Sequence, residues 1–366
     1  MLFRSLNYMN TDLQANRPDI ITTEIETINF YRKMDTEATV VEMIAGKYVL
    51  VEEYYSNGLQ VLAELRKNLL LKYQDKTPQG QRDYRNAFKK ASDRLLLKVK
   101  ENKLIVKKCP DITWLELLYP DTSEFYIPFS EVQDMSSSWQ SYKKGIEVKT
   151  LDLKIHPFYG TYFPTRFDHL KLFDKYLTKY DGEKNNVIEI GVGSGVLSFQ
   201  LLQNGFKNIF ASDINKNSII SVSKDSKLLG FEDKITLNHG DLFENCDVKA
   251  DLIVFNPPWI EAKHKLVDSI DKSRYFEEEL FPQFFEQAQK HLSENGKIVI
   301  LFSNQIELAN EESTHPIVKE LQKNNRFRKE LHLKRDVRAS SRRTKRRDSK
   351  DNEKVELWVL APKTKK

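Results

Sequence analysis

Hydrophobic positions change their spacing along the chain. From residue 184 onward, short apolar runs that suit single buried strands alternate with stretches whose apolar residues recur every three or four positions. This alternation predicts strands and helices in turn, and it is typical of a mostly parallel, doubly wound α/β sheet. The predicted strands are 187–190, 208–212, 235–238, 251–255 and 297–302, and the helices between them are 196–204, 217–229 and 282–292.

Two last predicted strands flank a basic stretch near the end of the chain. They lie near 328–337 and 355–361 and predict an antiparallel hairpin at one edge of the sheet. The whole pattern therefore predicts a Rossmann-like sheet of seven strands, most of them parallel. In such a sheet ligands bind beyond the carboxyl ends of the parallel strands, so residues that follow those strands are candidate binding or catalytic residues.

The first half of the chain has a mixed pattern. Apolar spacing predicts helices over 41–50 and 59–71, and alternation around Glu101-Asn102 predicts a hairpin of 95–99 with 103–107. The leucines expected on one face of the second helix are Leu59, Leu62, Leu65, Leu69 and Leu70.

A further helix is expected after Pro128. Ser130 is a candidate for its N-terminal cap, and Trp139 and Tyr142 fall on its apolar side. We therefore predict an α+β substrate-recognition domain over residues 1–150 and the Rossmann-like domain over residues 151–366.

Composition excludes several classes of protein. The chain has 366 residues, of which 40% are hydrophobic and 11% aromatic, so it is too apolar for a disordered chain and long enough for two domains. Its longest apolar stretches are far shorter than the roughly 20 residues of a membrane helix. Cys109 and Cys246 fit neither a disulfide framework nor a paired metal-ligand spacing. We expect a cytoplasmic protein with no metal and no membrane partner.

The basic residues are concentrated in one segment. Residues 334–350 contain nine Lys and Arg against two Asp, an excess of +7, whereas the whole chain has a net charge of +5. Clustered cations such as Arg342 and Arg343 bind phosphates without sequence preference, so these two arginines are candidate substrate contacts. A solvated hairpin tip explains the same cluster equally well.

The first predicted strand of the sheet ends in a glycine loop. Glycines allow the backbone to turn sharply and to approach a ligand closely. A dinucleotide-binding loop has the spacing G-x-G-x-x-G, whereas this one is E-x-G-x-G-x-G, which argues against a nicotinamide-dependent oxidoreductase. The loop resembles motif I of the class I S-adenosylmethionine-dependent methyltransferases. The resemblance implies that its charged and glycine residues bind the methyl donor, namely Glu189, Gly191, Gly193 and Gly195.

The next two strands each end in an acidic residue. Asp213 follows Gly191 by 22 positions, close to the spacing of about 20 at which an acidic residue accepts ribose hydroxyls. Asp241 and Leu242 close the third strand, and by resemblance to the same family Asp241 accepts from the adenine amino group. Either aspartate alone would suit a helix cap. Acids at two successive strand ends favour a binding site.

The fourth strand leads into Asn256-Pro257-Pro258-Trp259. This tetrapeptide resembles the motif of methyltransferases that act on nitrogens attached to planar groups. The Asn256 side chain and the Pro257 carbonyl can each accept one amine hydrogen, which turns the nitrogen lone pair toward the methyl group. The prolines hold the backbone, and Trp259 is expected to stack on the flat substrate. We assign catalysis to Asn256, Pro257 and Trp259, and substrate contacts to Pro258 and Trp259.

The segment 156–166 resembles one that precedes the catalytic domain in HemK-type protein-glutamine methyltransferases and helps to cover the cofactor. Trp259 stands where that family has tyrosine, and Thr165-Arg166 replace its proline-arginine order. The prediction is an S-adenosylmethionine-dependent N-methyltransferase acting on a macromolecule, with a protein glutamine and an RNA or DNA base both open as acceptors. The alternative is a non-enzymatic nucleic-acid-binding protein that retains the fold.

Overall fold

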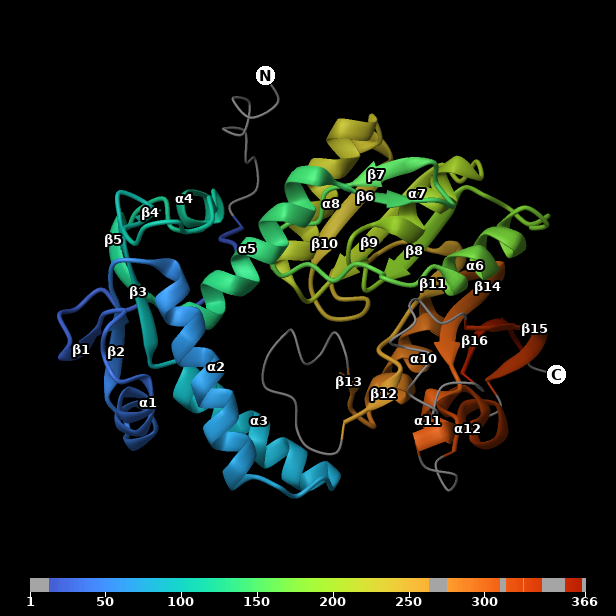
Figure 1. Ribbon diagram of the computed structural model, residues 1–366. Helices are drawn as coiled ribbons and strands as arrows, with labels where there is room; N and C mark the ends of the chain where they lie inside the picture. Colours follow the sequence, from blue (N-terminus) through green and yellow to red (C-terminus); the bar gives the residue numbers. More distant parts are fainter. Residues whose placement is uncertain (1–12, 263–274, 310–313, 325, 338–352, 364–366) are drawn as a thin grey trace. The chain divides into compact units, whose positions relative to one another are not determined.

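The computed structural model describes residues 13–262, 275–309, 314–324, 326–337 and 353–363, and the chain divides into two compact units. One unit is Asn16–Lys143, here called the N-terminal unit. The other is Lys144–Lys366 together with Met1–Ala15, here called the C-terminal unit. Each unit has its own sheet (Figure 1).

The N-terminal unit is built on a five-stranded mixed sheet. Its strands run in the order β1-β2-β3-β4, and β5 pairs with β3 as well. β1, β2 and β3 are parallel, whereas β4 and β5 run antiparallel to β3. The strands are β1 (Thr27–Phe30), β2 (Tyr48–Val51), β3 (Leu95–Lys100), β4 (Lys103–Leu104) and β5 (Glu124–Pro128), and the helices are α1 (Thr36–Ala45), α2 (Tyr55–Lys72), α3 (Pro78–Ser92), α4 (Trp114–Leu118) and α5 (Phe129–Lys144).

The hairpin around Glu101-Asn102 is confirmed. Lys100 pairs with Lys103, and both turn residues have positive φ angles, 52° and 56°, as a tight two-residue hairpin loop requires. The helix 59–71 is also confirmed, within α2. Of its leucines, Leu62, Leu65 and Leu69 are buried, whereas Leu59 and Leu70 are exposed. The apolar stripe of α2 is therefore narrower than the sequence pattern suggested.

Two expectations for this unit were wrong. The helix expected over 41–50 ends at Ala45, because Gly46 adopts a left-handed conformation with φ of 119° and caps α1, and the chain then enters β2. Ser130 is not a cap, because α5 already begins at Phe129 and places Ser130 in its first turn. Trp139 and Tyr142 are buried along α5, as predicted.

The C-terminal unit contains the predicted seven-stranded sheet. Its order is β10-β9-β8-β11-β14-β16-β15, with five parallel strands followed by an antiparallel hairpin (Figure 1). The strands are β8 (Asn186–Ile190), β9 (Asn208–Asp213), β10 (Ile235–His239), β11 (Ala250–Phe255), β14 (Leu292–Ser303), β15 (Phe327–Asp336) and β16 (Lys354–Pro362). All seven predicted strands are thus confirmed. β8 is the middle one of the five parallel strands, and the strand order reverses between β8 and β11.

Helices cover both faces of this sheet. Side chains of α6 (Asp168–Leu177), α7 (Val196–Gln203) and α8 (Lys216–Leu229) pack with one face, and α10 (Leu280–His291) and α12 (Pro316–Lys323) pack with the other. Alternation along β11 shows the division, because Leu252 and Val254 belong to the first core and Ile253 and Phe255 to the second. The shorter elements are β6 (Ile146–Val148), β7 (Leu153–Ile155), the 3₁₀ turn η1 (Glu232–Lys234), β12 (Ile260–Glu261), β13 (Tyr275–Phe276) and α11 (Gln305–Ala309).

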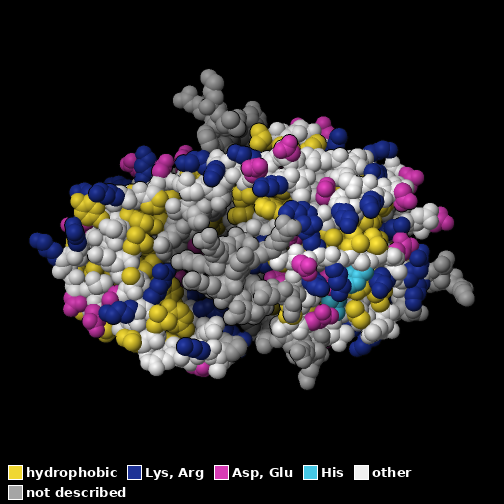
Figure 2. All heavy atoms as spheres, turned by 45° about the vertical axis from the view of Figure 1, so that its right-hand side comes forward, with side chains coloured by type: hydrophobic (Ala, Val, Ile, Leu, Met, Phe, Trp, Pro, Cys, Tyr) yellow, Lys and Arg dark blue, Asp and Glu magenta, His cyan; other side chains and the backbone are white. Residues whose placement is uncertain are grey.

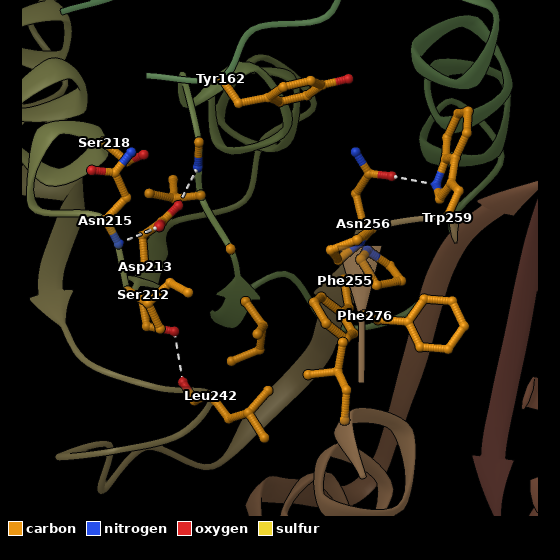
Figure 3. A pocket seen from close by; sticks show the side chains of 18 of the residues that line it. Tyr162, Ser212, Asp213, Asn215, Ser218, Leu242, Phe255, Asn256, Trp259 and Phe276 are labelled. Carbon is orange, nitrogen blue, oxygen red and sulfur yellow. Dashed lines mark hydrogen bonds between the residues drawn. The ribbon is translucent and has the colours of Figure 1, made fainter. Parts of the chain in front are cut away.

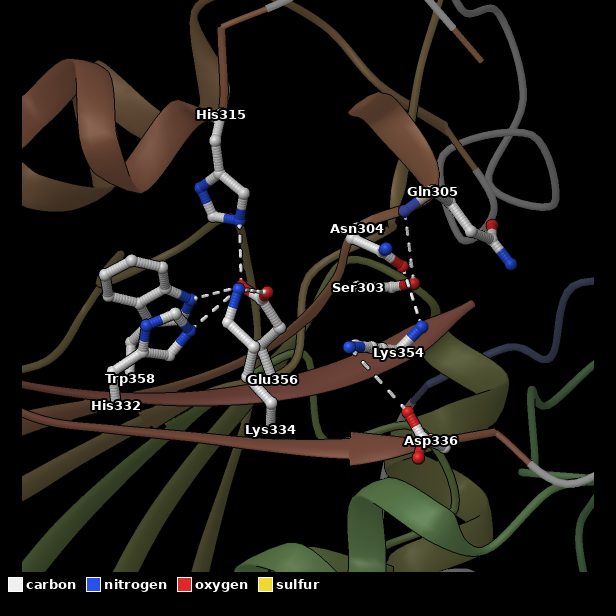
Figure 4. Close-up of polar contacts among 10 residues, drawn as sticks. All are labelled: Ser303, Asn304, Gln305, His315, His332, Lys334, Asp336, Lys354, Glu356 and Trp358. Carbon is white, nitrogen blue, oxygen red and sulfur yellow. Dashed lines mark hydrogen bonds and ion pairs between the residues drawn. The ribbon is translucent and has the colours of Figure 1, made fainter. Parts of the chain in front are cut away.

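A buried carboxylate fastens the antiparallel hairpin. Glu356 on β16 is 1% exposed. Its carboxylate accepts a hydrogen bond from Trp358 Nε1 at 2.8 Å and forms an ion pair with Lys334 Nζ at 2.8 Å (Figure 4). The Nε2 atoms of His315 and His332 lie 3.4 and 3.2 Å from the same carboxylate. Burial by itself raises the pKa of Glu356, but these four partners outweigh burial and hold the pKa well below its usual range. The hairpin therefore contains a permanent buried anion.

Several general properties of the described residues bear on function. Cys109 and Cys246 are both free thiols. No helix in the described ranges is long and apolar enough to cross a membrane. Within those ranges, no cluster of His, Cys, Asp and Glu is arranged to hold a metal ion. On the face shown in Figure 2, cationic and acidic side chains are interspersed.

Candidate active site

A large pocket opens at the carboxyl ends of the parallel strands of the C-terminal unit. Its volume is about 1090 Å³, at the upper end of the range for small-molecule sites, so it has room for a cofactor and for part of a second molecule. None of its described lining residues is Lys or Arg. Six carboxylic acids line it, namely Glu189, Asp213, Asp241, Glu277, Glu278 and Glu279. Charge in this pocket therefore favours a cationic ligand.

The glycine loop forms the floor of the pocket between β8 and α7. Gly191 and Gly193 line the cavity with positive φ angles of 70° and 52°. A Cβ atom on Gly193 would lie 3.4 Å from the Tyr162 carbonyl, so the glycine keeps the loop close to the segment above it. Gly195 is outside the lining. A Cβ there would approach Phe199 and Val222 at 3.0 and 3.1 Å, so Gly195 allows α7 to pack closely.

Glu189 is buried where β8 reaches the pocket. It is 1% exposed, and its carboxyl accepts a short hydrogen bond from the hydroxyl of Ser198 on α7. Burial raises the pKa of Glu189 to about 8, against the opposing effect of that hydrogen bond. At neutral pH this carboxyl is therefore mostly protonated in the ligand-free protein. A cationic ligand would favour its ionised form.

Asp213 ends β9 on the same side of the pocket. Its carboxylate accepts hydrogen bonds from the backbone N–H of Gly193 and of Asn215, both at 2.8 Å (Figure 3). Burial nevertheless raises the pKa of Asp213 above its usual value. These contacts fix the carboxylate between the glycine loop and the start of α8, where it lines the pocket.

The end of β10 completes the side of the pocket that carries the glycine loop and Asp213. Leu242 is buried with a positive φ of 46°, and its carbonyl accepts a hydrogen bond from Ser212 Oγ at 2.6 Å. Asp241 precedes it, lines the pocket and is exposed. The Ser212 contact thus ties the ends of β9 and β10 together beneath the cavity.

Asn256, Pro257, Pro258 and Trp259 line the opposite side of the pocket, beyond the end of β11 (Figure 3). Trp259 Nε1 donates a hydrogen bond to Asn256 Oδ1 at 3.2 Å. The indole is also packed edge-on against the imidazole of His169, with 5.6 Å between ring centroids. Trp259 therefore holds Asn256 in addition to offering an aromatic surface.

His169 is a pocket residue that the sequence analysis missed. It is 4% exposed at the start of α6, and burial lowers its pKa to about 4, against the attraction of neighbouring Asp168. The imidazole is therefore neutral at physiological pH. A single histidine in a helical pattern carries no signal that would distinguish it from a core residue.

The segment before α6 lies over the glycine loop. Asn215 and Asn217 donate side-chain hydrogen bonds to the carbonyls of Gly160 and Tyr159, at 2.9 and 2.7 Å. These bonds hold the segment so that Tyr162 and Pro164 line the cavity. The segment 156–166 thus lies beside the pocket, and its covering of a cofactor stays a prediction. Arg342 and Arg343, the other predicted substrate contacts, lie outside the described residues.

The sheet order, the glycine loop at the central strand and the Asn-Pro-Pro-Trp loop on the next strand define a class I methyltransferase domain. Comparison with known proteins supports this class. Residues 165–328 match the family described as Methyltransferase small domain. A protein of Methanocaldococcus jannaschii, provisionally named a protein N5-glutamine methyltransferase, is 30% identical over 166 residues, which are 43% of this chain and 79% of that protein. The chain belongs to this family of small-domain, S-adenosylmethionine-dependent methyltransferases.

Other relatives share a smaller part of their length. A bifunctional methyltransferase of Rickettsia prowazekii is 33% identical over 146 residues, which are 37% of this chain but only 28% of that protein. The crystal structure of a ribosomal protein L11 methylase from Lactobacillus delbrueckii subsp. bulgaricus matches with 21% identity and a TM-score of 0.38, covering 57% of this chain and 84% of that one.

Proposed function

We propose that this enzyme methylates the side-chain amide nitrogen of glutamine in a protein, with S-adenosylmethionine as donor. The observation that carries the proposal is the position of Asn256 and Pro257, which line a pocket shared with the glycine loop and Asp213. The relative from M. jannaschii, whose name assigns it glutamine N5 methyl transfer, supports this choice of acceptor. The alternative acceptor is an exocyclic amino group of a nucleic-acid base. The test below distinguishes it from a protein glutamine.

The residues on the cofactor side fit the donor. A Cβ atom added to Gly191 would have Phe255, 3.9 Å away, as its one near neighbour. The space above this glycine is therefore open to a ligand. The residues that would hold the donor are Glu189, Gly191, Gly193, Asp213, Asp241 and Leu242, all in the pocket lining. When bound, S-adenosylmethionine supplies a methyl group on a positively charged sulfonium. The carboxylic acids in the lining, without a described cation among them, suit that charge.

The acceptor-side residues orient a planar amide. An amide nitrogen is a weak nucleophile, because its lone pair is delocalised into the carbonyl. Asn256 Oδ1 accepts one hydrogen bond from Trp259 and keeps a second lone pair, which can accept a hydrogen of the substrate amide. The Pro257 carbonyl can accept the other hydrogen. Holding both hydrogens turns the nitrogen toward the donor side and supplies orientation, the main contribution expected of the protein in a direct displacement.

We also propose that residues 1–150 recognise the macromolecule and that residues 151–366 carry out methyl transfer, in a cytoplasmic protein without a metal. The test supplies the full chain with donor labelled on its methyl group and offers it a fractionated protein pool, total RNA and duplex DNA in parallel. Label in protein, mapped to glutamine by mass spectrometry, is the expected result. Label in a nucleic acid would overturn the choice of acceptor, and the absence of donor binding in calorimetry would overturn the proposal as a whole.

A further inference from the structure

Gln305 lies at the acceptor end of the pocket, in a position that neither the glycine loop nor the Asn-Pro-Pro-Trp loop explains. It follows β14, the neighbour of β11 on the side away from the glycine loop, and it lines the cavity. Its helix, α11, contacts β12, the strand that begins directly after Trp259. Gln305 therefore faces the part of the pocket where the acceptor is expected.

The carboxamide of Gln305 is held in one orientation. Its Nε2 donates a hydrogen bond of 2.5 Å to Glu353 Oε1, and Glu353 is 4% exposed. The other oxygen of Glu353 pairs with Arg166 Nη1 at 2.9 Å. Because a buried carboxylate paired with a guanidinium only accepts hydrogen bonds, the NH₂ group of Gln305 must face Glu353. The carbonyl oxygen, Oε1, is then the atom left for another partner.

That oxygen has no partner in the described part of the chain. Within the described ranges, the one hydrogen bond of the Gln305 side chain goes to Glu353, and the residue is half-buried in the lining of the cavity. Oε1 joins Asn256 Oδ1 and the Pro257 carbonyl as a hydrogen-bond acceptor among the residues that line this end of the pocket. A set of acceptors suits a ligand that donates through N–H groups and disfavours a carboxylate.

We propose that Gln305 determines acceptor specificity by accepting a hydrogen bond from an N–H group of the substrate amide or of the peptide that carries it. Glu353 and Arg166 are positioning residues that keep Oε1 directed to the substrate. The inference rests on the proposed function for its substrate class. It adds a recognition contact from the start of α11, directly after β14, where the chain carries no part of the methyltransferase motifs.

The test measures binding separately from methyl transfer. The probes are a blocked Ala-Gln-Ala tripeptide and the blocked Ala-Glu-Ala tripeptide, each titrated into the full chain saturated with the demethylated donor. Gln305→Met keeps the length of the side chain and removes the acceptor oxygen. We expect it to weaken binding of the glutamine peptide about tenfold, with donor affinity unchanged. Gln283→Met is the matched control. Gln283 lines the same pocket, its side chain is exposed, and that side chain makes no hydrogen bond to another described residue.

A double-mutant cycle tests the role of Glu353. Glu353→Gln can present either an oxygen or an NH₂ group to Gln305 and so releases its orientation. If Glu353 acts through Gln305, adding Glu353→Gln to Gln305→Met weakens peptide binding no further, whereas independent structural effects would add. Equal binding by wild type and Gln305→Met, or an equal loss in Gln283→Met, would overturn the inference. Methylation by the wild type is scored in the same samples, so failure of the proposed function is seen separately.

Discussion

The indole nitrogen of Trp259 donates a hydrogen bond to the side-chain oxygen of Asn256, with 3.2 Å between the two atoms (Figure 3). This contact decides which end of the Asn256 carboxamide is oxygen and where it points. It also gives the tryptophan a role that a purely stacking residue would not have. Loss of the indole N–H should therefore affect the orientation of Asn256 before it affects the aromatic surface.

Trp259→Phe keeps an aromatic ring and removes the donor. We expect the turnover number to fall about tenfold, as for the loss of one orienting hydrogen bond, with a smaller change in KM for the acceptor. Trp259→Ala should instead mainly weaken acceptor binding. Steady-state kinetics with both substrates varied would separate the two effects. A Trp259→Phe enzyme with wild-type turnover would show that the hydrogen bond has no part in orienting Asn256.

Asn256→Ala removes the acceptor for one amide hydrogen. Turnover should fall by about 10² or more, as expected when an oriented contact in the transition state is lost, while donor affinity stays nearly the same. Calorimetric titration with the donor and a single-turnover assay measure the two quantities. Methyl transfer at the wild-type rate would contradict the proposed geometry.

Glu189 should make the ligand-free protein less stable as pH rises from 6.5 to 8. The unfolded carboxyl ionises near pH 4.3, whereas the folded one, with its pKa raised to about 8, still retains its proton in this window. The native state therefore binds more protons than the unfolded state, and the free energy of unfolding falls by about 1.4 kcal/mol per pH unit. His169, whose pKa is lowered to about 4 in the folded state, opposes this loss at the lower end of the window, because its unfolded imidazole gives up its proton near pH 6.5. The contribution of Glu189 is therefore read from the difference between the wild type and Glu189→Gln.

Urea denaturation at pH 6.5 and pH 8 checks this expectation. The wild type should lose about 2 kcal/mol across the window. Glu189→Gln has no proton to lose and should lose much less. If the free energy of unfolding had the same pH dependence in the wild type and in Glu189→Gln, Glu189 would already be ionised in the folded state.

Glu356→Gln should destabilise the C-terminal unit by about 2 kcal/mol at pH 7, because the hydrogen bonds from Trp358 Nε1 and Lys334 Nζ lose their charged, buried acceptor. The pKa of Glu356 is lowered in the folded state, so its stabilising contribution is present above pH 4.3 and is lost as pH falls through the folded pKa. Glu330→Gln is the control, because Glu330 pairs with Lys297 and Arg328 nearer the surface and its removal should cost about 1 kcal/mol or less. Chemical denaturation gives the free energy of unfolding of both variants. An equal loss in the two would show that burial of Glu356 adds nothing to the stability of the hairpin.

The cluster of Lys and Arg in residues 334–350 leads to a prediction from the sequence alone. If it grips nucleic acid, replacing Arg342, Arg343, Arg346 and Arg347 together by Gln removes four possible phosphate contacts. The slope of log affinity against log salt should then shrink by roughly 3. Filter binding of RNA and duplex DNA over a salt series measures this slope. An unchanged slope would leave the segment as solvated surface and would favour a protein acceptor.

The sequence predicted the sheet of the C-terminal unit well, because its central parallel strands, such as β8 and β11, are short apolar runs and a functional loop follows each of them directly. The same logic placed Asp213 and Asn256 at the pocket, since the carboxyl ends of parallel strands share one edge. It failed where a residue acts through distant partners. Gln305 depends on Glu353, 48 positions later, and nothing in the local pattern around either residue indicates their contact.

Local rules also failed where two signals competed. Residues 41–50 continue an apolar helical pattern past Gly46, yet the left-handed glycine and the β-favouring run from Tyr48 to Val51 end the helix there. Gly195 stays a predicted ligand contact from its place in the motif, and the structure also shows that a Cβ there would approach Phe199 and Val222 closely. Spacing alone does not separate these two uses of a glycine.

The hairpin of β15 and β16 has a practical consequence for protein engineering. The backbone N–H of Val337 donates to the carbonyl of Glu353 at 3.0 Å, so the two chain ends that bracket residues 338–352 are already fastened to each other. The entropy of closing a loop between fixed ends changes slowly with its length. Replacing residues 338–352 by a short turn should therefore keep Val337 and Glu353 paired. The same exchange would remove Arg342 and Arg343, so it would separate folding of the hairpin from any contact that these arginines make with a substrate.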